Sequence, residues 1–169
     1  GSAAILAAPG CGQDGRAPTC PRAYLPGQPR RLVRVVRSDG MPTDPLPIPA
    51  FETPEAYATC LEDAAFWAPY VAAILQRHGL PLAPLEIGRV GSFPTFLVGR
   101  SVVKLFGDRI AGPSCYRSER IVLRLLRDHP SIPAPTLLAD DSLFDRSAAG
   151  WHWPYLLMTR VDGVISRGV

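Results

Sequence analysis

The sequence is short of lysine: 17 of its 18 basic side chains are arginine, and Lys104 is the single exception. It also has no apolar run near the roughly 20 residues that a membrane helix needs. The opening run Ala3–Ala8 is too short for a secretion signal and has no basic residues before it. These absences argue against membrane insertion and secretion, and we expect a cytoplasmic protein.

Cysteine is also scarce. Cys11, Cys20, Cys60 and Cys115 show no metal-ligand spacing, so the sequence offers no zinc site and predicts no metal-binding residues. In a reducing compartment we expect Cys60 and Cys115 to be buried free thiols.

The net charge of +3 is unevenly spread. Residues 1–40 hold six arginines and two aspartates, whereas residues 41–169 hold 12 basic and 13 acidic side chains. Because the positive charge lies on the N-terminal segment, the total does not indicate a nucleic-acid partner. Binding of nucleic acid through residues 30–37 remains a minor alternative, which would be strongly salt-dependent.

Composition divides the chain into regions. Residues 1–50 contain nine prolines and six glycines and predict a disordered tail. Residues 51–84 predict helices, beginning with Thr53 as N-cap and Pro54 at the first position, and stopping at Gly79. Pro69 favours a break in the helical pattern near residues 66–69.

The pattern then changes to β structure. Residues 85–91, 95–99 and 101–106 predict three strands, with a tight turn at Gly99-Arg100. A helix is expected over 114–128, followed by strands near 135–139 and 155–160 and a polar connection over 140–150. The fold class is therefore α+β, with a five-stranded antiparallel sheet preceded by N-terminal helices.

Lys104 stands in the third of these strands. Alternation places it on one face with Val102 and Phe106, whereas Val103 and Leu105 take the other face. An ammonium among apolar neighbours needs a partner or a wet cleft, because burying it alone costs several kcal/mol.

The next helix contains a carboxylate in a similar position. Glu119 falls on a stripe with Cys115, Val122, Leu123 and Leu126. An ion pair between Lys104 and Glu119 would explain both positions. The alternative is that Glu119 lies in solvent at the margin of the stripe and that Lys104 extends to water.

Four segments in order resemble the aminoglycoside and hygromycin-type phosphotransferase family, which has a protein-kinase-like fold. They are a turn and strand at 91–99 followed by 102–105, a helix around 118–126, a strand at 132–139, and a strand with a hinge at 153–163. The resemblance covers residues 85–163 and implies a kinase-like small lobe that carries a Glu-bearing helix.

The resemblance also implies site residues. Lys104 would contact the α- and β-phosphates of ATP and be held by Glu119. The turn of Gly91, Ser92 and Phe93 would offer backbone donors to phosphate, as such turns can. The remaining positions would surround or hydrogen-bond the adenine: Val90, Val102, Met158, Thr159 and Val161.

In this family the catalytic Asp, the Mg²⁺ ligands and the acceptor surface lie beyond the hinge. None of the three histidines opens an H-x-D-x-x-x-x-N motif, so we expect residues 164–169 to begin a missing lobe and the chain to be inactive alone. The parent would phosphorylate a small-molecule acceptor. The alternative is a non-catalytic module whose exposed hinge-side face supports self-association or binds a second lobe in trans.

Overall fold

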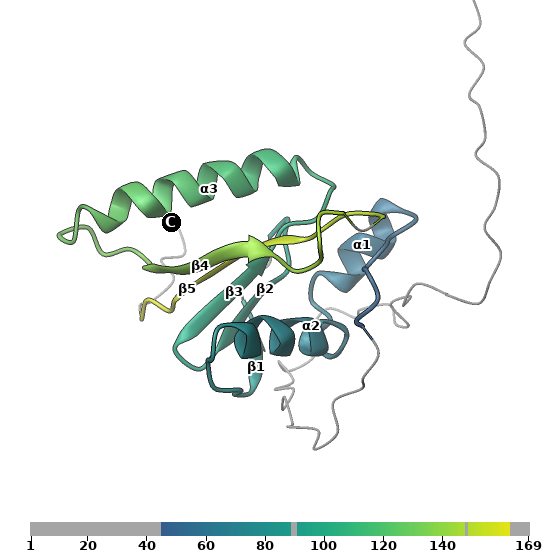
Figure 1. Ribbon diagram of the computed structural model, residues 1–169, viewed down its shortest axis with the longest axis horizontal. Coiled ribbons are helices and arrows are strands. Elements are labelled where there is room, and N and C mark those ends of the chain that lie inside the picture. Colours follow the sequence, from purple (N-terminus) through teal and green to yellow (C-terminus); the bar gives the residue numbers. More distant parts are fainter. Residues whose placement is uncertain (1–44, 89–90, 148, 163–169) are drawn as a thin grey trace, which may run out of the picture.

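The computed structural model describes residues 45–88, 91–147 and 149–162 (Figure 1). These residues form an α+β fold with three helices and a five-stranded antiparallel sheet, as the sequence predicts. The expected tail up to residue 44, the site residue Val90 and the segment 163–169 lie outside the described residues.

Two helices precede the sheet: α1, Pro54–Cys60, and α2, Ala64–Arg77. The Thr53 side chain accepts a hydrogen bond from the Ala56 amide, and Gly79 has a φ of 65° just beyond α2, so both predicted ends are confirmed. The predicted break near residues 66–69 is wrong. The chain breaks earlier because the Asp63 side chain caps α2, and Pro69 lies exposed inside that helix.

The strands lie in the order β1-β2-β3-β5-β4, and all neighbours are antiparallel. Their bounds are β1 Leu85–Ile87, β2 Thr95–Val98, β3 Ser101–Leu105, β4 Leu137–Ser142 and β5 Pro154–Thr159. Val98 pairs with Ser101, which leaves Gly99, with a φ of 57°, in the predicted two-residue turn.

The expected polar connection begins later than predicted. Asp140 and Asp141 belong to β4 and pair in register with Leu156 and Tyr155 of β5. Pairing with a buried neighbouring strand outweighs the low strand propensity of aspartate, because that propensity depends on context.

Helices cover both faces of the sheet. Figure 1 shows α2 on one side and the long helix α3, Gly112–Arg127, on the other. The α2 side holds the larger core, which includes Trp67, Phe96, Val103 and Trp153. The α3 side holds a smaller cluster with Phe93, Phe106, Tyr116, Leu123, Leu156 and Met158. The two faces of β3 therefore enter different cores, as its alternation predicts.

The prediction of a disordered tail is wrong for residues 45–50, because Leu46 and Ile48 pack against the larger core and side-chain hydrogen bonds hold the segment there. The Trp153 indole donates to the Pro49 carbonyl at 3.0 Å, and the Tyr70 hydroxyl donates to the Pro47 carbonyl at 3.0 Å. The predicted free thiol at position 60 is wrong, because Cys60 is disulfide-bonded, whereas Cys115 is free and partly buried. No helix of the described chain is long and apolar enough to cross a membrane.

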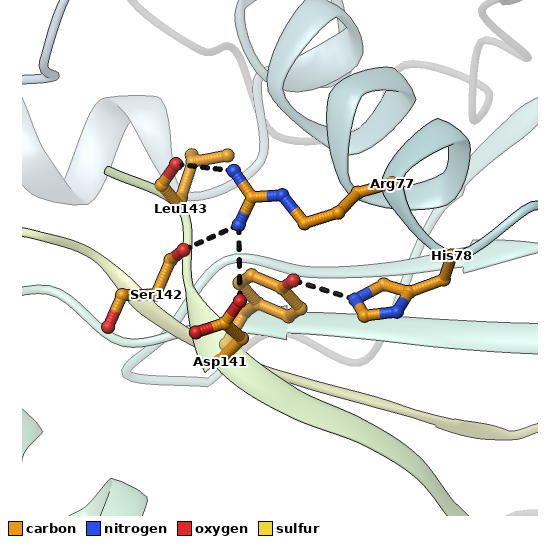
Figure 2. Close-up of polar contacts among 6 residues, drawn as sticks. Arg77, His78, Asp141, Ser142 and Leu143 are labelled. Atoms are coloured by element: carbon orange, nitrogen blue, oxygen red, sulfur yellow. Dashed lines mark hydrogen bonds and ion pairs between the residues drawn. The ribbon is translucent and has the colours of Figure 1, made fainter. Parts of the chain in front are cut away.

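Arg77, at the end of α2, fastens that helix to the edge strand. Figure 2 shows its guanidinium reaching β4 and the residue after it, where it donates to the carbonyls of Ser142 at 2.6 Å and Leu143 at 3.0 Å. The same group lies 3.4 Å from the Asp141 carboxylate. Because carbonyl groups of an edge strand invite pairing with another chain, this contact also covers the C-terminal end of that strand.

Candidate functional site

The site is built around an ion pair that joins β3 to α3. The Lys104 ammonium donates to the Glu119 carboxylate, so the pairing expected from the sequence is present. The Lys104 side chain is 22% exposed and that of Glu119 is 38% exposed. The pair therefore lies at the border between the smaller core and solvent, where the ammonium remains within reach of an anion.

Two aromatic rings flank the ammonium. Lys104 Nζ lies 5.2 Å from the centre of the Phe106 ring and 5.5 Å from that of Phe93. The two rings contact each other at a centroid distance of 5.0 Å. A cation beside aromatic faces is attracted by their quadrupoles, so the two rings and Glu119 together fix the position of the ammonium.

The beginning of α3 is set by a close backbone approach. A side-chain carbon added at Gly112 would lie 1.7 Å from the Gly107 carbonyl oxygen, so only glycine fits there. Before it, Ile110 and Ala111 have φ values of 53° and 55°, and the Arg109 guanidinium donates to the Phe51 carbonyl at 2.6 Å. This connection sets where α3 starts, and thereby where Glu119 meets β3.

The inward face of α3 differs in part from the predicted stripe. Leu123 is buried and Glu119 faces β3, but Val122 is 51% exposed, and Tyr116 takes the inward place instead. Helical spacing defines the inward face only approximately, and packing on the sheet turns Tyr116 and Leu123 inward.

A second ion-pair cluster was missed by sequence reasoning. The Asp140 carboxylate on β4 accepts from Arg124 at 2.9 and 3.1 Å and from Arg120 at 3.3 Å. The prediction that Asp140 and Asp141 belong to a polar connection is wrong, because both lie in β4, where strand alternation sends Asp140 toward α3 and Asp141 toward Arg77 of α2. The spacing of Arg120 and Arg124 on one helical face was the available sequence indication.

The predicted phosphate turn lies next to the pair. Phe93 is buried against Lys104, whereas Gly91 and Ser92 are exposed. The Tyr57 hydroxyl of α1 donates to the Ser92 carbonyl at 3.0 Å. Burial, with a smaller contribution from the Asp108 carboxylate, raises the pKa of Tyr57 well above its ordinary value, so this donor keeps its proton. The turn is thereby tied to the N-terminal helices.

The predicted adenine-side residues divide into two groups. Val102 and Met158 are register partners in β3 and β5, and both pack in the cluster that contains Phe93 and Phe106. Thr159 is further along β5, where its amide donates to the Thr136 carbonyl and its hydroxyl accepts from the Thr136 amide. Val161 follows the strand and is 48% exposed.

Within the described ranges, no three His, Cys, Asp or Glu side chains gather to hold a metal ion. No protein-family model matches the chain. What the described residues bring together is one oriented ammonium and a turn with exposed Gly91 and Ser92 at the edge of an apolar cluster.

Proposed function

We propose that the chain is the ATP-binding small lobe of a kinase-fold phosphotransferase that resembles the aminoglycoside and hygromycin-type enzymes. The observation that carries the proposal is the Lys104–Glu119 ion pair between the third strand and the helix that follows it. In protein kinases a lysine and a glutamate at these two places must pair before the nucleotide is correctly bound.

The surroundings of the pair support the same proposal. Five antiparallel strands with a single helix inserted between β3 and β4 provide the order of parts that a kinase-like small lobe requires. Val102 and Met158 are neighbours on the Lys104 face, which is where apolar contacts to an adenine ring are needed.

In the proposed complex, Lys104 contacts the α- and β-phosphates and the backbone at Gly91, Ser92 and Phe93 lies against phosphate oxygens. Val90, Val102 and Met158 enclose the adenine. The Thr159 carbonyl and the Val161 amide hydrogen-bond its edge, since Thr159 is the last residue of the strand that carries Met158 and Val161 lies two residues beyond it.

Phosphoryl transfer requires more than these residues. Mg²⁺ would accompany the nucleotide, but its ligands and the Asp that orients the acceptor hydroxyl are not among the residues assigned here. We therefore expect the 169-residue chain to bind ATP weakly and to transfer no phosphoryl group. The acceptor of the parent would be a small hydroxylated molecule.

The proposal is tested by titrating the chain with a fluorescent ATP analogue and competing with ATP. Lys104→Ala should abolish the phosphate-dependent part of the binding, whereas Arg117→Ala, an exposed cation on the same helix as Glu119, should leave it unchanged. Adenosine, which has no phosphate, should bind both variants equally. Absence of ATP binding by the unaltered chain, or equal ATP affinity after Lys104→Ala, would contradict the proposal.

A further inference from the structure

A hollow of about 370 Å³ lies between the C-terminal half of α3 and β4, and neither Lys104 nor Glu119 lines it. Its apolar lining includes Leu123 of α3 and Leu137 of β4, and Arg124, Arg127, Leu138 and Asp140 also border it. Neither the proposed nucleotide contacts nor the ion pair uses this hollow.

The strand side of the hollow is open. β4 is the last strand in the sheet order, so its outer edge pairs with no other strand of the described chain. Its register shifts between Leu137 and Ala139, and the intervening Leu138 is 48% exposed. The exposed Leu138 lies beside a hollow whose lining combines Leu123 and Leu137 with charged side chains, and a partner's side chain can cover such a leucine.

The helix side of the hollow is basic. The Asp140 side chain is 16% exposed, and its carboxylate already forms ion pairs with Arg120 and Arg124. Among the residues that the structure describes, the Arg127 guanidinium has one ionic partner, the Asp128 carboxylate at 3.7 Å, and these side chains are 68% and 71% exposed. Such an exposed, long pair contributes little, so the Arg127 guanidinium is available to an incoming carboxylate.

We propose that this hollow, with Leu138 and Arg127 at its border, docks a protein segment in which a bulky apolar side chain stands beside Asp or Glu residues. The apolar side chain enters against Leu123 and Leu137, and the carboxylates meet Arg127 and the outer side of Arg124. Interfaces of this type gain most of their affinity from one buried anchor, and complementary charge adds specificity.

Charge argues against a second copy of the chain as the occupant. A two-fold symmetric contact opposes each surface to itself, which would bring Arg124 and Arg127 of one copy against the same residues of the other. Like charges held together in this way are repelled at a cost. The occupant is therefore an acidic segment of a different protein, and this inference does not depend on nucleotide binding.

The test is a selection from a random 16-residue peptide display library against the full 169-residue chain. Enriched peptides are then synthesised with a fluorescein label, and their affinities are measured by anisotropy. We expect enriched sequences to combine an aromatic or aliphatic residue with flanking Asp or Glu, and their affinity to fall as salt rises.

Two variants and two matched controls locate the binding. Arg127→Glu and Leu138→Glu should each weaken binding by about tenfold or more, the effect of losing one important contact. Arg117→Glu and Ile121→Glu place the same charge at exposed positions of α3 outside the hollow and should change the affinity by less than about twofold. Equal thermal unfolding of all four variants shows that folding is intact.

Three results would overturn the proposal. The first is a selection without enrichment, and the second is enrichment of sequences that lack acidic residues. The third is equal binding by Arg127→Glu and Leu138→Glu, which would place the peptide elsewhere, for example on the arginines before residue 41.

Discussion

The ammonium of Lys104 lies 5.2 Å from the centre of the Phe106 ring, on the face of β3 that α3 covers. Phe93 approaches the same ammonium from the turn before β2. The only lysine of the chain is thus paired with a carboxylate and enclosed by two rings. Reagents that modify amines can therefore report on this one position of the fold.

Phe93→Leu should increase the rate at which Lys104 is acetylated. Leucine keeps the site apolar but removes a cation–π contact of about 0.5–1 kcal/mol, which corresponds to roughly a two- to fivefold faster reaction. The measurement is mass spectrometry of the Lys104 peptide after brief treatment with an acetylating ester. Phe144→Leu alters a ring on the opposite core and is the control. An equal increase in the acetylation rate in both variants would indicate that the whole fold has loosened and that Phe93 does not specifically shield Lys104.

Arg77→Ala should destabilise the fold by about 2 kcal/mol. It removes charged hydrogen bonds to the carbonyls of Ser142 and Leu143, and such bonds contribute roughly 1.5–3 kcal/mol. The neighbouring Gln76 is exposed, so Gln76→Ala should have little effect. Urea unfolding of the two variants measures the difference, and equal midpoints would show that Arg77 does not fasten α2 to β4.

Gly112→Ala should be among the most harmful single-carbon changes. Its methyl group would meet the Gly107 carbonyl, and overpacking of this kind typically costs 1–3 kcal/mol. Displacement of the start of α3 should also separate Glu119 from Lys104 and accelerate acetylation of the lysine. Pro113→Ala changes the next, exposed residue and should have neither effect. A Gly112→Ala protein of unchanged stability would show that the backbone at Gly112 does not pack tightly against the Gly107 carbonyl.

Stability should fall at alkaline pH partly because of Tyr70. Burial raises its pKa from 10.0 to about 12, so the folded state holds a proton that the unfolded chain releases above pH 10. The contribution of Tyr70 to the free energy of unfolding is complete below pH 10. It is lost between pH 10 and about 12, at no more than about 1.4 kcal/mol per pH unit. Tyr70→Phe should flatten this part of the curve of unfolding free energy against pH. An unchanged slope would show that Tyr70 is not responsible.

The sequence predicted the features that depend on neighbours along the chain. The cap at Thr53, the stop at Gly79, the turn at Gly99 and the two faces of β3 follow from local stereochemistry and alternation. The Lys104–Glu119 pair could also be predicted, because each charged group stood on an otherwise apolar face and needed compensation.

Other features depended on distant partners. Pro69 could not be placed inside α2 without knowing that Asp63 begins the helix three residues after α1 ends. Asp140 and Asp141 are polar in sequence, yet they form a strand because Arg124 and Arg77 neutralise them from opposite faces. The contact of Tyr57 with Ser92 spans 35 residues and leaves no periodic pattern.

The positions of the tryptophans determine which part of the fold tryptophan fluorescence reports on. The ring centroids of Trp67 and Trp153 lie 5.1 Å apart in the core beneath α2, and Trp151 packs against the same core. All three tryptophans of the chain are thus on one side of the sheet. Intrinsic fluorescence will therefore follow the melting of the α2 layer, whereas detachment of α3 alone would pass almost without a change in emission.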